Sequence, residues 1–497
     1  MNEGHCEERQ QVSPENSLGE QNMIEDAIQR CQEGLAICPD NAELWYALGT
    51  NLLALSRFSE AVTALQQAIV LKPDFAAAYN NFGGALLELQ RPAEAVQALH
   101  QAIALRPDAV GAYSNLGNAL VQLQKPAEAI TVLQQALAIN PDFAAAYNNL
   151  GNALQSQGKV ADAIAAYNRA IALNPKNLEV YNNRSKAILL SGNLACGFAE
   201  YEWRTKVKRR RHLYEWCADK PRWHGESFAG KRLLIFHEQG FGDALHFCRY
   251  LPLVKTRGGS VQFSVPKPLL RLFSNFPGID KLIEHSAAAI SETQFDLAVP
   301  LLSLPNIFGT TLHTIPVSVP YLTAEQHSIA AWRGKVNCPG TNLRVGLAWA
   351  GDPANIPGQI RSCGLQAMSP LAAIPGLTFY SLQKGAAAQQ TNAPPPGMQL
   401  IDLTAGIEDF ADTAALIMNL DLVISIDTAV AHLAGALGKP VWTLLPAAGE
   451  WRWLLARNDS PWYPTMRLFR QSAPGDWNSV MTAVARELRT LLSATAK

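Results

Sequence analysis

The sequence predicts an α-helical solenoid followed by an α/β region made of two parallel-sheet halves. Two observations support this fold class. Before the linker, several residue types recur with a fixed step of 34 positions, which is typical of stacked helical repeats. From Gly230 onward, short apolar runs rich in β-branched residues alternate with helical patterns, which favours parallel strands joined by helices. We expect five segments: a disordered tail over 1–20, the solenoid over 21–208, a linker over 209–229, and the two halves over 230–322 and 323–497.

Composition narrows the possible functions. A chain of 497 residues is long enough for about three domains. Its formal net charge of -1 gives no argument for binding nucleic acid or an acidic membrane surface. None of the eight cysteines forms a C-x-x-C pair, the polar start is unlike a signal peptide, and no apolar run is long enough to span a bilayer. We expect a soluble cytoplasmic protein without a metal site, a cofactor, a nucleic-acid partner or a membrane span.

The 34-residue step identifies tetratricopeptide repeats. Each repeat holds two amphipathic helices, with glycine and alanine where they approach closely and proline after the second helix. Four full repeats cover about Asn41 to Lys176, a half-repeat precedes them, and a segment over 194–206 departs from the pattern as a cap would. The columns that keep the step are Pro39, Pro73, Pro107, Pro141 and Pro175; Trp45, Tyr79, Tyr113, Tyr147 and Tyr181; Gly49, Gly83, Gly117 and Gly151; and Ala61, Ala95, Ala129 and Ala163.

A column of asparagines keeps the same step and lies on the first helices, which line the concave surface of such solenoids. Its members are Asn81, Asn115, Asn149 and Asn183. Their amides could hold the backbone of an extended peptide without reading its sequence. The column resembles the asparagine ladder in the superhelix of protein O-GlcNAc transferases, which implies a protein or peptide acceptor. The alternative is a structural hydrogen bond within the repeats.

The stretch over 420–446 predicts a β-α-β unit. A buried strand is followed at once by Asp427 and Thr428, which are good helix N-cap residues, and then by a small-residue helix and a second buried strand. The start of that helix leaves N–H groups free and carries the positive end of the helix dipole, so it can bind an anion. His432 shares the face of Thr428 and can point at the same anion. The alternative is a simple cap and a core histidine.

The rest of the α/β region alternates strands and helices. In the first half we predict strands at 232–236, 260–265 and 295–299 and helices at 244–256 and 268–276. In the second half we predict strands at 343–349, 378–383, 399–403, 420–426 and 441–445, helices at 408–419, 429–437 and 477–496, and a polar loop over 352–362. Each half is Rossmann-like. Two such halves with a cleft between them suggest a GT-B arrangement.

Two motifs resemble glycosyltransferase family 9, the family of the bacterial lipopolysaccharide heptosyltransferases. They are EQGFGDALHFCRYLP over 238–252 and SIDTAVAHLAGALGKPVW over 425–442. The resemblance implies that Asp243 is the general base of an inverting transfer, although it could also simply cap the helix that follows it. It also implies that Gly240, Gly242, Asp427, Thr428 and His432 bind a nucleotide-diphosphate sugar.

No D-x-D triplet occurs in the sequence, so we expect cations of the chain, in place of a metal, to stabilise the leaving group. Arg361 and Lys384 are candidates because both follow predicted strands on the cleft side, and each roughly matches a basic residue of related transferases. The loop before Arg361 departs from the family, which is rich in basic residues there. The tryptophans Trp451, Trp453 and Trp462 could stack on a base or sugar, or pack domains together.

The leading hypothesis is an inverting, metal-independent glycosyltransferase whose repeats present a protein or peptide acceptor. A second hypothesis is a non-catalytic repeat scaffold with a degenerate transferase domain. A third is a GT-B-fold epimerase or hydrolase that acts on a nucleotide sugar without an acceptor. The family 9 resemblance suggests ADP-heptose as the donor, whereas the repeats suggest UDP-GlcNAc, and physical reasoning from the residues leaves both open.

Overall fold

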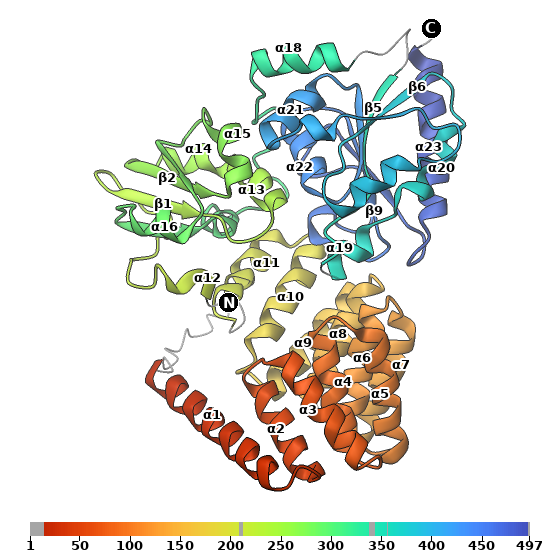
Figure 1. The fold of residues 1–497 in the computed structure, drawn as a ribbon. Coiled ribbons are helices and arrows are strands. Elements are labelled where there is room, and N and C mark those ends of the chain that lie inside the picture. Colours follow the sequence, from red (N-terminus) through yellow and green to blue (C-terminus); the bar gives the residue numbers. More distant parts are fainter. Residues whose placement is uncertain (1–13, 208–211, 337–342, 355, 496–497) are drawn as a thin grey trace, which may run out of the picture. The chain divides into compact units, whose positions relative to one another are not determined.

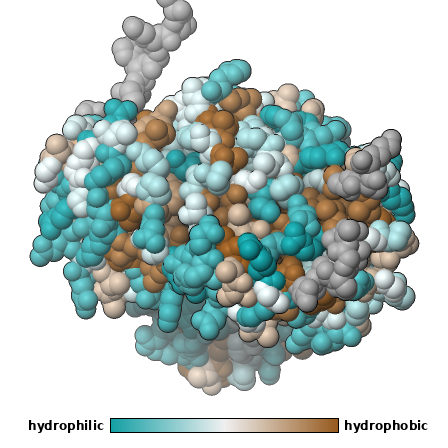
Figure 2. Space-filling model, turned by 90° about the horizontal axis from the view of Figure 1, so that it is seen from above, coloured by the Kyte–Doolittle hydropathy of each residue, from teal (hydrophilic) through white to brown (hydrophobic). Residues whose placement is uncertain are grey.

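The computed structural model describes residues 14–207, 212–336, 343–354 and 356–495 (Figure 1). The chain divides into two compact units, 1–153 and 154–497, and each is described by itself. Among the described residues, no helix is long and apolar enough to cross a membrane. On the face shown in Figure 2, hydrophobic residues are interspersed with hydrophilic ones.

The first unit consists of paired helices, as the 34-residue step predicts. The helix α1 begins at Pro14, inside the stretch for which we expected disorder, whereas residues 1–13 lie outside the described part of the chain. The helices are α1 (Pro14–Ile37), α2 (Ala42–Ala54), α3 (Phe58–Leu71), α4 (Ala76–Glu88), α5 (Pro92–Leu105), α6 (Val110–Gln122), α7 (Pro126–Ile139) and α8 (Ala144–Ser156), whose end belongs to the second unit.

The recurring glycines explain how the two helices of a repeat pack. A Cβ added to Gly83 would lie 2.7 Å from Cγ of Leu99, and one added to Gly117 would lie 2.4 Å from Cγ of Leu133. Leu99 and Leu133 are fully buried. The glycine therefore leaves room for a leucine of the second helix. A close-packed interior has no spare space for that leucine if a Cβ is present.

The second unit begins with repeat-like helices and continues into the first parallel sheet. The helices are α9 (Val160–Leu173), α10 (Leu178–Leu190) and α11 (Leu194–Tyr201), followed by the 3₁₀ turn η1 (Glu202–Thr205) and by α12 (His212–Glu215). The sheet has the order β3-β2-β1-β4, with β1 (Arg232–Phe236), β2 (Ser260–Val265), β3 (Lys281–Glu284) and β4 (Leu297–Pro300), all parallel.

The connections of this half differ from the two long helices that we predicted. The stretch over 244–256 forms α13 (Phe241–Phe247), the turn η3 (Cys248–Tyr250) and α14 (Leu251–Lys255). Pro252 explains the break, because it has no N–H to donate to Cys248. The remaining connections are η4 (Lys267–Leu269), α15 (Leu270–Phe273), α16 (Ala287–Ser291), η5 (Leu301–Ser303) and α17 (Leu304–Ile307).

The second half holds a six-stranded parallel sheet of order β10-β9-β8-β5-β6-β7. Its strands are β5 (Leu343–Ala348), β6 (Leu377–Ser381), β7 (Leu400–Asp402), β8 (Leu422–Ile426), β9 (Val441–Leu445) and β10 (Met466–Arg470). The helices and turns are α18 (Gln326–Lys335), α19 (Ile356–Arg361), η6 (Leu365–Met368), α20 (Ser369–Ala372), η7 (Ala386–Asn392), η8 (Thr404–Gly406), α21 (Phe410–Met418), α22 (Ala429–Ala436), η9 (Trp451–Trp453) and α23 (Trp477–Thr495). The predicted loop over 352–362 is therefore wrong in part, because it contains α19.

These two sheets confirm the predicted fold class of a helical solenoid followed by two Rossmann-like halves, drawn green and cyan to blue in Figure 1. In each sheet the chain leaves the first strand in one direction and later returns to its other side, so the strand order reverses between β1 and β4 and between β5 and β8. Ligands of such sheets bind at the carboxyl ends of the strands beside this reversal.

Candidate functional site

A cleft of about 1170 Å³ lies between the two halves of the second unit. It collects residues that follow β1, β5, β6 and β8. All eight residues of this unit that the sequence assigns to the base and the nucleotide sugar line it: Gly240, Gly242, Asp243, Arg361, Lys384, Asp427, Thr428 and His432. The sequence did not single out Glu450 and Arg452, which line the same cleft.

The turn between β8 and α22 presents an uncapped helix start to the cleft. Thr428 is the N-cap residue, with φ of −139° and ψ of 174°, but within the described residues its side chain makes no capping hydrogen bond. Its hydroxyl instead lies 3.1 Å from the hydroxyl of Ser425. Ala429 and Val430, the first helical residues, line the cleft. The side chain of Thr428 therefore does not cap the helix, contrary to the simpler alternative. The free N–H groups at the helix start can instead bind an anion.

His432 is both a core residue and a cleft residue. Its Nδ1 is 2.9 Å from the hydroxyl of Tyr463, and its ring stacks between His246 and Trp453 with centroids 5.2 and 5.3 Å away. Its Nε2 lies 3.7 Å from Oδ1 of Asp427. Burial, together with nearby arginines, holds the pKa of His432 well below its usual 6.5. The imidazole is therefore neutral near pH 7 and acts as a hydrogen-bonding group, not as a cation.

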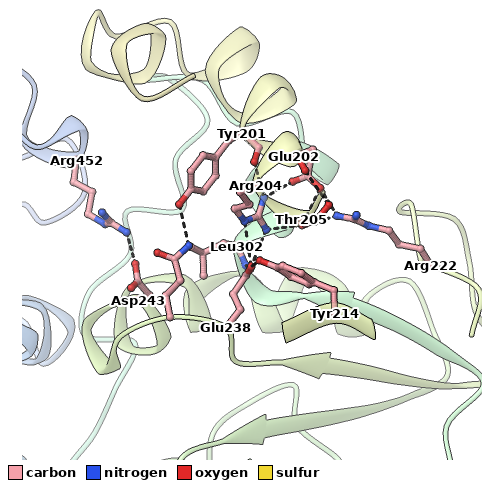
Figure 3. Close-up of polar contacts among 12 residues, drawn as sticks. Tyr201, Glu202, Arg204, Thr205, Tyr214, Arg222, Glu238, Asp243, Leu302 and Arg452 are labelled. Carbon is pink, nitrogen blue, oxygen red and sulfur yellow. Dashed lines mark hydrogen bonds and ion pairs between the residues drawn. The ribbon is translucent and has the colours of Figure 1, made fainter. Parts of the chain in front are cut away.

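Asp243 is the third residue of α13 and points into the cleft beside Arg452 (Figure 3). One carboxylate oxygen accepts the N–H of Gly240 at 3.0 Å, and the other forms an ion pair with Arg452. The capping role is therefore present together with exposure to the cleft. Gly242 allows α13 to approach α22, because a Cβ there would lie 2.9 Å from Cδ2 of His432.

Arg452 connects the groups on both walls of the cleft. Its guanidinium pairs with Asp243 and Glu450, and its Nε is 3.2 Å from Nδ1 of His246. Burial, with Asp427 and Asp243 nearby, raises the pKa of Glu450 to about 7, although Arg452 opposes the shift. From the sequence, only the tryptophans of this run were candidates for a ligand contact. The signal that was missed is a pair of charged residues in a Trp-rich turn at the carboxyl edge of a parallel sheet.

The two predicted cations differ in their surroundings. Lys384 donates to the carbonyl oxygens of Thr404 at 3.0 Å and Ile407 at 2.9 Å, which leaves one of its three protons for a ligand. Arg361 ends α19, and its Nε is buried without a hydrogen-bond partner in the described part of the chain. A buried donor without a partner is costly, so Arg361 is the better placed of the two to receive an anion.

The asparagine column makes hydrogen bonds between neighbouring repeats of the first unit. The Nδ2 of Asn81 donates to Oγ1 of Thr50 at 3.1 Å, and that of Asn115 donates to Oδ1 of Asn80 at 3.0 Å. The Nδ2 of Asn149 lies 3.0 Å from the carbonyl oxygen of Ser114. The structural alternative is therefore realised for these three, while Asn183 lies on α10 in the second unit.

Comparison with known proteins identifies both parts of the chain. The Tetratricopeptide repeat family matches residues 46–110 and 114–178, and Glycosyltransferase family 9 (heptosyltransferase) matches residues 387–460, which include β8, α22 and Arg452. Protein FlbA of Caulobacter vibrioides (strain ATCC 19089 / CIP 103742 / CB 15) is 30% identical over 293 residues, which are 54% of this chain and 48% of that protein. The chain thus spans about half the length of this curated relative.

Two solved structures are similar to separate parts of the chain. A thermophilic TPR protein of Thermus thermophilus has a TM-score of 0.33 and 23% identity, over 35% of this chain and 98% of that one. A glycosyl transferase family 9 protein of Veillonella parvula DSM 2008 has a TM-score of 0.42 and 10% identity, over 55% of this chain and 100% of that one. The two family matches identify the chain as a tetratricopeptide-repeat protein that carries a C-terminal glycosyltransferase family 9 domain.

Proposed function

We propose that this glycosyltransferase is inverting and independent of metal, and that it transfers a sugar from a nucleotide-diphosphate sugar to a hydroxyl of a protein or peptide. The observation that carries the proposal is the pair of strand ends that meet in the cleft. One presents a carboxylate, Asp243, and the other presents the uncapped start of α22. A base and an anion site on opposite walls are what displacement of a diphosphate requires.

The leaving diphosphate would bind at the start of α22. The N–H groups of Ala429 and Val430 and the hydroxyl of Thr428 are donors there, and Arg361 supplies a guanidinium with a buried, unpartnered Nε among the described residues in the same cleft. Fixed donors in a site that excludes water stabilise developing charge strongly, since they need no reorganisation during the reaction. In this proposal the chain itself supplies the positive charge that a metal supplies elsewhere.

Asp243 would accept the proton of the acceptor hydroxyl. The oxygen then bonds to the anomeric carbon while the bond from that carbon to the diphosphate breaks, and the electron pair leaves with the diphosphate. Attack from the side opposite the leaving group inverts the anomeric centre. Arg452 pairs with Asp243 in the structure, so the base becomes available when the guanidinium turns toward the bound diphosphate. The repeats, with the asparagine column, would present the acceptor.

The first experiment is thermal shift of the full chain with UDP, ADP, GDP and CMP. We expect one nucleotide to stabilise the wild type. Val430→Asp should abolish the shift, because it places a carboxylate at the helix start where the diphosphate binds, and Thr428→Ala should weaken it. Asn478→Asp also adds a carboxylate near a helix start, that of α23, at an exposed position, and should leave the shift intact. No shift with any nucleotide would contradict the proposal and favour the repeat scaffold.

The second experiment tests the base. With the nucleotide sugar that corresponds to the stabilising nucleotide, Asp243→Asn should lower the release of nucleoside diphosphate about 10²- to 10⁴-fold. The nucleotide-induced thermal shift should remain. Release of free sugar or of an epimer at the full rate without any acceptor would favour the hydrolase or epimerase hypothesis.

A further inference from the structure

A buried ion pair joins the end of the repeat region to the first Rossmann-like half (Figure 3). Arg204 lies in η1, and Glu238 follows β1 by two residues. Both side chains are 0% exposed. The guanidinium binds the carboxylate in two places, with Nη2–Oε1 at 2.9 Å and Nε–Oε2 at 3.1 Å. This bidentate geometry fixes orientation as well as distance.

The remaining hydrogen-bonding groups of the pair are also satisfied. Arg204 donates to Oε1 of Glu202 at 2.9 Å, to the carbonyl oxygen of Tyr201 at 3.2 Å and to the hydroxyl of Ser303 at 2.9 Å. Glu238 accepts the N–H of Leu302 at 3.0 Å and the hydroxyl of Tyr214. Because all these hydrogen bonds are formed, the pair is held in a single geometry. Breaking one of them would leave a buried charge partly unpaired in a low-dielectric environment, which is costly.

The pair occupies the place where such a half normally binds a ligand. Glu238 follows β1, and Leu302 and Ser303 follow β4, so the carboxylate lies at the strand-order reversal of this sheet. Here the crevice receives Arg204, a side chain from the repeat end. The first half is thus completed by the segment that precedes it.

The same segment contacts the loop that precedes the proposed catalytic carboxylate and also a residue next to the arginine that pairs with it. Gln239, one residue after Glu238, donates to the hydroxyl of Tyr201 at 2.9 Å, so two successive residues of the loop that leads to Asp243 are anchored. On the other side, Phe198 of α11 packs edge-on against Trp451, with centroids 5.5 Å apart. Trp451 is the neighbour of Arg452, which pairs with Asp243.

We propose that residues 194–205 anchor the loop that leads into the active-site cleft and that Arg204 is a positioning residue for Asp243. The inference rests on the proposed function for the role of Asp243, but the anchoring itself does not. The end of the repeats is then more than an acceptor-recruiting module, because it fixes the loop that carries the base.

The test is hydrogen–deuterium exchange of the full chain, followed by mass spectrometry. In Arg204→Met, amides over 237–247 should exchange at least about tenfold faster than in the wild type, whereas those of β8 and α10 should not change. Tyr201→Phe removes one hydroxyl and keeps the ring, so it should fold normally and speed exchange of the same loop by a smaller factor. Arg184→Met breaks the partly buried ion pair of Arg184 with Glu200, also in the repeat end, and should leave the loop unchanged.

A kinetic measurement separates positioning from a general loss of structure. With the nucleotide sugar identified by thermal shift, Arg204→Met should lower kcat about tenfold or more and change KM for the donor less than about twofold, because the groups proposed to bind the diphosphate, Arg361 and the start of α22, lie on the other half. Unchanged loop exchange in both Arg204→Met and Tyr201→Phe would overturn the inference, even if transfer is confirmed. Faster loop exchange with no nucleotide bound by the wild type would support the anchoring and contradict only the proposed function. If Arg204→Met unfolds, Tyr201→Phe alone decides.

Discussion

At the scale of single residues, the cleft is organised by charges that share one partner. Arg452 pairs with both Asp243 and Glu450, and Asp427 lies close enough to act on the pKa of Glu450. Three carboxylates around one guanidinium cannot all be fully neutralised. The pKa of Glu450 rises to about 7, because its side chain is partly buried and lies beside two other acids.

This shift predicts a pH-dependent stability. The pKa of Glu450 is raised from 4.5 to about 7 on folding, so its contribution is fully present below about pH 4.5 and is lost as the pH rises through about 7. Glu450→Gln removes the ionisation. The wild type should therefore lose about 1–2 kcal/mol of unfolding free energy relative to the variant between these pH values, less than the full shift because the side chain is 32% exposed. Urea denaturation at several pH values measures this, and parallel curves would contradict it.

Arg452 leads to a second prediction at this scale. A lysine keeps the charge but cannot reach Asp243, Glu450 and His246 at once, because it lacks the planar fork of the guanidinium. Arg452→Lys should therefore lower nucleoside diphosphate release about tenfold or more while the chain still folds. Arg457→Lys, at a partly exposed pair with Asp459, is the matched control and should retain the wild-type rate. If Arg452→Lys releases nucleoside diphosphate as fast as Arg457→Lys and the wild type, Arg452 has no role in the reaction.

Some of these cleft residues could be predicted from the sequence to lie together, whereas others could not, and the difference has a physical reason. Asp427 directly follows β8, and Asp243 lies in the first turn of α13, the helix that follows β1. Carboxyl ends of parallel strands face one edge, so the meeting of these two residues could be predicted. Arg452 lies seven residues beyond β9 in an irregular turn. The path of that turn depends on packing of Trp451 and Trp453, which are buried, and not on any local periodicity.

At the scale of elements, the central strands and the edge strands β4 and β7 were predictable, whereas the edge strands β3 and β10 were not. The strands β1, β2 and β9 have the predicted bounds, since each is a short apolar run buried along nearly its whole length. The strands β3 and β10 were missed. They lie at sheet edges, and β3 has one fully buried residue while β10 carries two arginines, so neither shows the apolar run of a buried strand.

The repeat helices allow a matched test of why glycine recurs. Gly117→Ala places a Cβ 2.4 Å from Cγ of Leu133, so the helices must separate and the first unit should lose about 1–3 kcal/mol. Gly84→Ala is the control on α4, because its Cβ would meet only Nδ2 of Asn115 at 3.7 Å. At this position alanine, which forms helices better than glycine, should raise the free energy of unfolding of the first unit by about 0.5–1 kcal/mol. Chemical denaturation measures both, and shifts of the same sign would contradict the packing argument.

At the scale of the whole molecule, the compact second unit does not coincide with the family 9 match. The unit begins at residue 154, whereas the match begins at residue 387, and α9 to α11 fold with the α/β region. The buried pair of Arg204 and Glu238 accounts for part of this, because without the repeat end the buried carboxylate of Glu238 loses the guanidinium that neutralises it. The helices α9 to α11 are therefore not freely separable from the α/β region in this chain.

Fragments of the second unit test this dependence. A fragment over 158–497 retains Arg204 and should unfold cooperatively and keep the nucleotide-induced thermal shift of the full chain. A fragment over 212–497 leaves Glu238 without its guanidinium, and an uncompensated buried charge costs about 3–5 kcal/mol, so it should melt at a clearly lower temperature or not fold cooperatively. Glu238→Leu in the shorter fragment removes the charge and should raise the melting temperature of that fragment, although the same change in the longer fragment should lower it.

Thermal denaturation followed by circular dichroism measures the melting temperatures of both fragments with and without the substitution. Equal melting temperatures of the two unsubstituted fragments would show that the repeat end does not complete the domain.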